Sequence, residues 1–288
     1  MSSAGMSSKR MSSGPGAQPA LSLTSRLTSN LARGPLFFFF TGVFGCMSLA
    51  ASFLEKDGQL QHNIARRWAR TSLRIAGAPV TVVGRENLLP VAVYTSNHTS
   101  FMDTPLVFSS LPFQFRILAK QSLWKWPFIG WHLQRSGQIP VDEESGSGSV
   151  AGLNRAIRAL KSGMPLFIFP EGGRTQDGQV QPFMRGPAYI SIRARVPLVP
   201  IALIGTYELL PIHTHHFRPR PVKLVIGKPI DPAGYTIRQT DELTAKLREE
   251  ILQLYQSHAA PGDLSPCLAT PSADAFPESH PEVAREDL

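Results

Sequence analysis

The chain has 288 residues, 42% of them hydrophobic, which is enough apolar material for one sizeable core with a small appendage. The formal charge of +8 is uneven, because the last 28 residues carry six acids and one arginine, leaving about +13 on residues 1–260. Such a surface attracts polyanions: an anionic membrane, a phosphorylated small molecule or nucleic acid. Two cysteines exclude a disulfide framework and a cysteine-built zinc site, and favour a reducing compartment.

Two segments precede the first predicted strand. Residues 1–34 are rich in serine and glycine, contain no acid, and are predicted to form a disordered basic arm; an organellar transit peptide is the alternative. Residues Leu36–Leu54 then run for 19 residues without a charge, just long enough as a helix to cross about 30 Å of hydrocarbon. We expect a membrane anchor, either spanning or interfacial, with a buried core helix as the alternative.

A different pattern follows at Gln59–Ala76. Apolar residues recur near one helical face, and four arginines accompany them (Arg66, Arg67, Arg70 and Arg74). This composition is typical of an interfacial helix on an anionic bilayer. A basic surface helix packed on the domain is the alternative.

From Ala78 onward, short β-rich runs alternate with helical ones. "VTVV", "VAVYTS" and "RILA" are predicted strands, the stretch before Gly163 is a predicted helix, and "PLFIFPEG", "VPLVPIALIG" and "VKLVIG" are further strands. This alternation predicts an α/β domain with a largely covered sheet. Asp241–Ser257 is predicted to be a closing helix, and the proline-dotted tail after Pro261 to be disordered.

The stretch "SNHTSFMDTP" places a histidine at the end of a predicted buried strand and an aspartate five residues later. Ligands usually bind at such a strand end, and histidine can accept a proton near neutral pH. His98 therefore suits a general base, with Asp103 curling back onto its other ring nitrogen to fix the tautomer. Alternatively, Asp103 is only a helix N-cap, or it serves both roles.

A second polar strand end occurs in "FIFPEGGRT". Gly172 and Gly173 would let backbone amides approach a ligand closely, and Arg174 offers a planar fork suited to phosphate. Two polar strand ends in one α/β domain, one with His and Asp and one with Glu and Arg, are stronger evidence for a site than either alone.

Four blocks together resemble the glycerophospholipid acyltransferases. "NHTSFMD" resembles their His-x4-Asp signature, "FPEGGRT" their Phe-Pro-Glu-Gly-x-Arg block, and "VPLVPIAL" and "RSGQIPVD" the two others. The order matches, and the resemblance runs from about residue 68 to residue 230. "LAKQSLWKWPFIGW" and "PFMRGPAYISI" resemble the 1-acylglycerol-3-phosphate acyltransferases in particular.

The resemblance implies a reaction and a set of site residues. A fatty acyl thioester, acyl-CoA or acyl carrier protein, would acylate the sn-2 hydroxyl of lysophosphatidic acid to give phosphatidic acid, with no cofactor and no metal. His98 would be the base and Asp103 its partner. Arg174 would bind the acceptor phosphate, with Lys120 and Arg185 as second choices. Glu171 would orient the acceptor glycerol or hold Arg174, and amides near Gly172 would stabilise the oxyanion.

One departure concerns the acceptor. Where many family members have Ile-Asp-Arg, this chain has Val141, Asp142 and Glu143. An acid in place of a phosphate-binding arginine leaves another lyso-lipid acceptor open. A non-catalytic membrane scaffold and a metal hydrolase using "HTHH" (213–216) are the remaining alternatives, although that spacing matches no common zinc pattern. The scattered basic residues form no recognised nucleic-acid module.

The predicted organisation is a basic arm (1–34), a membrane-binding segment (35–76), a catalytic domain (77–258) and an acidic tail (259–288). The domain would be α/β with a mixed sheet flanked by helices, held at a membrane on the cytoplasmic face. Four aromatic residues would lie at the membrane interface, line the acyl path or belong to the core (Trp124, Trp126, Phe128 and Trp131).

Overall fold

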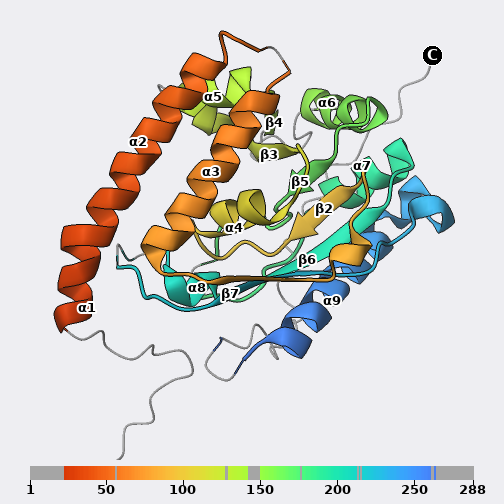
Figure 1. The fold of residues 1–288 in the computed structure, drawn as a ribbon. Coiled ribbons are helices and arrows are strands. Elements are labelled where there is room, and N and C mark those ends of the chain that lie inside the picture. Colours follow the sequence, from red (N-terminus) through yellow and green to blue (C-terminus); the bar gives the residue numbers. More distant parts are fainter. Residues whose placement is uncertain are drawn as a thin grey trace, which may run out of the picture.

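The computed structural model describes residues 23–55, 57–126, 129–141, 150–175, 177–212, 214, 216–260 and 263. Its centre is a seven-stranded sheet with the order β1-β7-β6-β2-β5-β3-β4 (Figure 1). The strands are β1 (Val80–Val83), β2 (Val93–Ser96), β3 (Arg116–Lys120), β4 (Ile139–Val141), β5 (Leu166–Ile168), β6 (Leu198–Ile204) and β7 (Val222–Ile226).

The sheet is mixed, as the sequence predicted. Neighbouring strands are parallel except for β6 and β7, which pair antiparallel, for example through Ala202 and Val225. β2 lies in the middle, between β6 and β5. The carboxyl ends of β6, β2, β5 and β3 therefore meet at one edge, here called the carboxyl edge.

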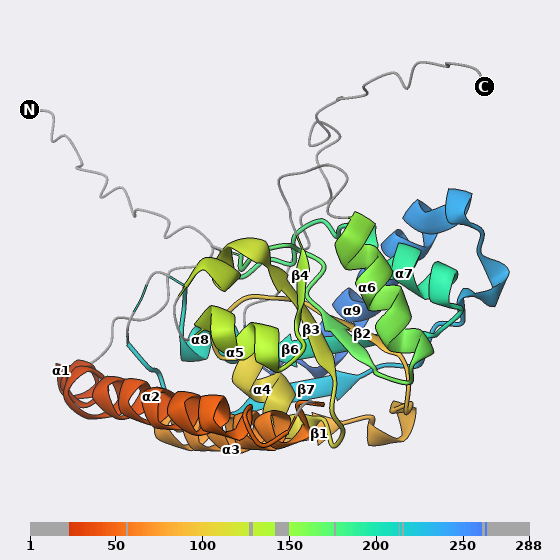
Figure 2. The same cartoon turned by 90° about the horizontal axis from the view of Figure 1, so that it is seen from above.

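Helices cover both faces of this sheet (Figure 2). α3 and α4, with α2 packed beside α3, cover one face, and α6, α7 and α9 cover the other. The helices from α2 on are α2 (Gly34–Ala51), α3 (Gln59–Ala76), α4 (Asp103–Ser110), α5 (Ile129–Arg135), α6 (Val150–Lys161), α7 (Gly186–Ala194), α8 (Thr206–Leu209) and α9 (Thr240–His258). Short 3₁₀ turns occur at Arg85–Asn87, Gln121–Lys125, Pro232–Gly234 and Ile237–Gln239.

Side chains of the central strand alternate between the two cores, because successive residues of a strand point to opposite faces. Tyr94 of β2 packs in the cluster under α3 and α4, whereas its neighbour Val93 packs in the cluster under α6, α7 and α9. Both are fully buried. β2 is thus covered on both faces, and polar side chains that follow it must emerge at the carboxyl edge.

The N-terminal helices differ from the expectation in one respect. The chain is helical from Leu23, with α1 (Leu23–Thr28) and a π-helical stretch (Ser29–Arg33) leading into α2, so the disordered arm predicted through residue 34 is too long. The buried Ser29 accepts a hydrogen bond from the Phe217 amide at 2.7 Å, which ties this stretch to the domain. Leu23–Ala51 is long and apolar enough to cross a membrane.

The basic helix α3 has the predicted bounds, but its apolar face packs on the domain. Ile64 and Leu73 are buried, and α3 packs against α4 and α2. Trp68 donates from Nε1 to Thr41 Oγ1 of α2 at 3.0 Å. This matches the alternative of a packed surface helix, so its apolar face is not available to a bilayer.

Three further points concern the sequence predictions: one strand that they lack, two exposed tryptophans, and several residues that the structure does not describe. Strand β4 was not predicted as a strand. Trp126 and Trp131 are exposed, so they are not core residues. Residues 1–22, Phe128, Asp142, Glu143, His213, His215 and the tail after Asp263 lie outside the described residues.

Candidate active site

The end of β2 is held to β6 by an asparagine side chain. Asn97 donates from Nδ2 to the Leu203 carbonyl at 2.9 Å, and its Oδ1 accepts from the Leu203 amide at 2.8 Å. Asn97 is fully buried, and its side-chain amide satisfies the hydrogen-bonding groups of the Leu203 backbone in β6, just after β2 ends. The next residue, His98, therefore leaves the sheet from a fixed point at the carboxyl edge.

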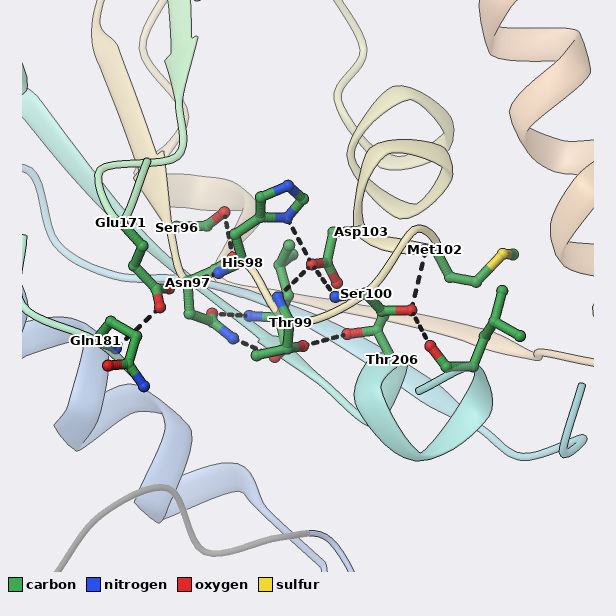
Figure 3. Close-up of polar contacts among 12 residues, drawn as sticks. Ser96, Asn97, His98, Thr99, Ser100, Met102, Asp103, Glu171, Gln181 and Thr206 are labelled. Atoms are coloured by element: carbon green, nitrogen blue, oxygen red, sulfur yellow. Dashed lines mark hydrogen bonds and ion pairs between the residues drawn. The ribbon is translucent and has the colours of Figure 1, made fainter. Parts of the chain in front are cut away.

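His98 and Asp103 form a hydrogen-bonded pair (Figure 3). His98 Nδ1 lies 2.9 Å from Asp103 Oδ2, and the same oxygen accepts from the amides of Thr99 and Ser100 at 2.7 and 2.8 Å. The Asp103 carboxylate thus faces back into the loop. Asp103 is the first residue of α4 and makes no side-chain cap, so the N-cap interpretation is wrong.

The ring of His98 is held from a second side. It stacks on the Phe169 ring, with centroids 3.9 Å apart and an interplanar angle of 20°. The Asp103 side chain is fully buried, whereas that of His98 keeps 18% of its surface exposed. Within the described part of the chain, Nε2 has no hydrogen-bond partner. A substrate proton can therefore be accepted at Nε2 while Nδ1–H donates to Asp103.

Glu171, which follows β5, contacts the main chain of the histidine. Its Oε1 accepts from the His98 amide at 2.6 Å, and its Oε2 accepts from the Gln181 amide at 2.9 Å (Figure 3). Burial raises the pKa of Glu171 to about 8, against the opposing effect of these two amides. Neither contact involves Arg174, so Glu171 does not hold that arginine.

Arg174 lies beside the loop that carries the histidine and aspartate. Its guanidinium carbon is 3.4 Å from the ring centroid of Phe101, which lies between His98 and Asp103 in the chain. Thr175, the next residue, donates its amide to the His98 carbonyl at 3.1 Å. Arg174 Nη1 is buried and has no partner among the described residues, and burial lowers the pKa of this guanidinium. A cation with an unused donor lies next to the pair.

Residues 79–204 match the Acyltransferase family model. This segment is an acyltransferase-family domain. The resemblance expected from the four sequence blocks is confirmed, and His98, Asp103, Glu171 and Arg174 all lie within the matched segment.

Curated relatives support the same family. The chain is 30% identical over 226 residues to a chloroplastic 1-acyl-sn-glycerol-3-phosphate acyltransferase of Brassica napus, a match that covers 74% of this chain and 64% of the relative. It is 26% identical to the 1-acyl-sn-glycerol-3-phosphate acyltransferase of Saccharomyces cerevisiae, covering 73% of this chain and 71% of the relative. The chain therefore spans slightly less than two thirds of the Brassica relative.

A solved structure has a similar fold. It is the crystal structure of the 1-acyl-sn-glycerophosphate (LPA) acyltransferase from Thermotoga maritima, with a TM-score of 0.68 and 28% identity. The match covers 81% of this chain and 97% of that chain. Because this coverage exceeds the segment matched by the family model, the similarity extends beyond residues 79–204.

The remaining predicted residues make other contacts than with the pair. Gly172 adopts a left-handed φ of +72°, and its amide donates weakly to Phe169 O at 3.4 Å, whereas a Cβ on Gly173 would meet open space. Lys120 is exposed at the end of β3. Arg185 forms an exposed ion pair with Asp241 of α9. The structure thus joins His98, Asp103 and Glu171, places Arg174 beside them, and engages Arg185 elsewhere.

Several contributors to the candidate site were not predicted. Asn97, Phe101 and Phe169 contact segments about 70 to 106 residues away in sequence. Gln181 binds Glu171, ten residues before it. Only Asn97 carried a sequence signal, since a polar residue directly after a buried strand needs a partner. Among the described residues no group of three His, Cys, Asp or Glu side chains could hold a metal; His213 and His215 of the "HTHH" stretch lie outside them.

Proposed function

We propose that this chain transfers a fatty acyl group from an acyl thioester to the sn-2 hydroxyl of 1-acyl-glycerol-3-phosphate, giving phosphatidic acid. The observation that carries the proposal is the contact between His98 Nδ1 and Asp103 Oδ2 at 2.9 Å, with Oδ2 also bound by two backbone amides. The proposed chemistry fits the activity for which relatives such as the Brassica and Saccharomyces enzymes are named.

In the proposed mechanism His98 is the general base. Its Nε2 takes the proton of the acceptor hydroxyl as the hydroxyl oxygen attacks the thioester carbonyl, and Asp103 stabilises the imidazolium that forms. The tetrahedral intermediate then collapses, the carbon–sulfur bond breaks, and the imidazolium proton passes to the thiolate. No acyl-enzyme and no cofactor are needed. Positioned proton transfer of this kind contributes roughly 10²–10⁴ in rate.

Arg174 is the proposed ligand of the acceptor phosphate. Its buried, unpartnered Nη1 supports this role, because a buried guanidinium donor without a partner is costly until an anion binds. Lys120 and Arg185 are weaker candidates, since Lys120 is exposed two strands away from β2 and Arg185 pairs with Asp241. Amides around Gly172 and Gly173 are the proposed donors to the oxyanion.

A second part of the proposal concerns the membrane. The outer face of α2 carries exposed apolar side chains: Leu36, Phe38, Phe39, Val43 and Met47. Because α2 also packs along α3 and α5, lying in the interface suits it better than spanning. The exposed Arg67, Arg70 and Arg74 of α3 would face anionic lipid on the cytoplasmic side.

Thiol release tests the reaction. Detergent-solubilised protein is assayed with acyl-CoA, and separately with acyl carrier protein, against lysophosphatidic acid and several other lyso-lipids. His98→Ala should lose at least about 10²-fold in kcat. His258→Ala, a histidine at the end of α9, is the matched control and should keep wild-type turnover.

The outcomes separate the alternatives. Turnover with lysophosphatidic acid that depends on His98 supports the proposal. Turnover only with another lyso-lipid keeps the mechanism and changes the acceptor. Near-normal turnover by a folded His98→Ala variant refutes the mechanism, and no turnover with either donor in wild type favours the non-catalytic scaffold.

A further inference from the structure

Arg248 of helix α9 contacts the stretch at residues 180–181, which lies next to the candidate site. Arg248 donates from Nη2 to the Val180 carbonyl at 2.9 Å and from Nε to the Gln181 carbonyl at 3.3 Å. Arg248 lies outside the segment that matches the acyltransferase family model. Its two donors clamp successive carbonyls of a stretch that otherwise has no regular secondary structure.

The clamped stretch continues into Glu171. The Val180 carbonyl and the Gln181 amide are the two ends of one peptide group, and the Gln181 amide donates to Glu171 Oε2 at 2.9 Å. A charged donor on the carbonyl polarises that peptide and strengthens its N–H as a donor. A further bond, from the Met184 amide to the Pro170 carbonyl at 2.8 Å, holds the same two segments together.

Glu171 also binds the main chain of His98. Its other oxygen, Oε1, accepts from the His98 amide at 2.6 Å, so each carboxylate oxygen binds one main-chain N–H (Figure 3). One of these amides belongs to the proposed base and the other to the stretch that Arg248 clamps. The contacts form an unbroken line from Arg248 through the 180–181 peptide and Glu171 to His98.

We infer that Arg248 is a positioning residue for the proposed acyl transfer, which acts through the 180–181 peptide and Glu171 to fix the main chain of His98. This inference rests on the proposed function. It assigns to Glu171 a role toward the enzyme's own backbone, not toward the acceptor glycerol. It also makes α9 part of the catalytic apparatus, although Arg248 binds main-chain carbonyls and not the His98–Asp103 pair itself.

A double-mutant cycle in the full-length chain tests the line. Arg248→Met removes both donors, and Arg248→Lys keeps the charge but cannot span both carbonyls. Glu171→Gln replaces one acceptor by a donor, which must face one of the two main-chain amides that Glu171 binds. Lys246→Met, two residues away on α9 and in contact with Tyr235, is the matched control. kcat and KM for lysophosphatidic acid and the thermal midpoint are measured for each.

We expect Arg248→Met to lower kcat about tenfold or more with KM within about twofold of wild type, since misplacing a catalytic group affects the transition state. Arg248→Lys should recover only part of the loss in kcat, and Lys246→Met should keep the wild-type kcat. The double variant Arg248→Met/Glu171→Gln should be no slower than Glu171→Gln alone, because both changes break one line. Additive losses, or a normal kcat in Arg248→Met, overturn the inference.

Amide hydrogen exchange tests, independently of turnover, whether Arg248 fixes the main chain of His98. Arg248→Met should speed exchange of the His98 amide at least tenfold while the amides of β6 stay protected, and unchanged exchange at His98 overturns the inference. Loss of protection throughout the domain would also overturn it, because Arg248 would then serve global stability. If turnover does not depend on His98, the proposed function fails, and exchange still reports on the line of contacts.

Discussion

A buried histidine of α3, separate from the proposed base, predicts how stability depends on pH. His62 of α3 donates from Nε2 to the Phe113 carbonyl at 3.0 Å and packs against the rings of Phe108 and Phe115, with centroids 5.2 and 4.9 Å away. Its Nδ1 is buried without a partner among the described residues. Burial, the largest cause, lowers the pKa of His62 from 6.5 to about 4, and the charges of nearby arginines act in the same direction.

The sign and size of the effect follow from linkage. The unfolded chain binds this proton at pH 6.5 and the folded chain only near pH 4, so unfolding takes up a proton between these values and acid favours the unfolded state. The contribution of His62 is fully present above pH 6.5 and is lost as the pH falls toward 4. A shift of this size corresponds to about 3 kcal/mol at pH 4.

The substitution His62→Gln removes the titration and keeps an N–H that can reach the Phe113 carbonyl. We expect the variant to be less stable than wild type by about 1 kcal/mol at pH 7. Near pH 4 the order should reverse, because the difference changes by about 3 kcal/mol. Urea unfolding followed by far-UV circular dichroism between pH 4 and 7.5 gives the difference at each pH. Other titrating groups cancel in it. A difference that stays constant with pH would refute the reasoning.

Three further predictions follow from single residues. Arg174→Gln should raise KM for a phosphate-bearing acceptor roughly tenfold to a hundredfold with a smaller change for acceptors without phosphate, measured by thiol release. Glu171 has a folded pKa raised from 4.5 to about 8, so its contribution to stability is present below pH 4.5 and is lost as the pH rises through 8; Glu171→Gln should flatten the fall in thermal midpoint over this range. Gly84→Ala should lower stability by roughly 2 kcal/mol or more, because φ is +79° and the new Cβ would lie 2.1 Å from the Ile226 carbonyl oxygen; Gly163→Ala, at +88° in open space, should cost only about 1 kcal/mol.

The strand ends that carry the site could be predicted, because each follows a local signal. A buried apolar run followed by polar residues marks both the end of β2 and the end of β5, and parallel strands bring such ends together. The sequence therefore predicts that His98, Asp103 and Glu171 belong to one site. Their mutual hydrogen bonds confirm that they lie together and leave their catalytic roles as predictions.

The partners of these residues could not be predicted in the same way. Glu171 was expected to face the acceptor or Arg174, yet it binds two main-chain amides, and no sequence pattern reports where a backbone N–H will point. The contact of Arg248 with the Val180 carbonyl joins segments 68 residues apart. Such contacts depend on how α9 packs on β6, which is a property of the assembled sheet and not of either segment.

The surroundings of the N-terminal apolar helix could be predicted only in part. An apolar run predicts burial in lipid or in protein, and in α2 one face packs on the domain while the other is exposed. Phe37 contacts Phe217 on the domain, whereas Phe38 and Phe39 are exposed by 70% and 64%. Composition alone cannot divide a helix in this way, because nearly every residue of α2 is apolar.

The course of α2 relates the proposed membrane contact to the proposed chemistry. Near its start Phe37 packs on Phe217, with ring centroids 5.5 Å apart, in the segment after β6 and α8. Near its end Ser48 hydrogen-bonds to His132 of α5, after β3, at 2.9 Å. β2 and β5 lie between β6 and β3 in the sheet, so α2 extends along the carboxyl edge past the strands that carry His98 and Glu171. If α2 lies in the interface as proposed, this edge is held at the depth of the lipid headgroups. A lyso-lipid could then present its hydroxyl and phosphate to the edge while its acyl chain stays in the bilayer, which would spare the cost of moving that chain through water.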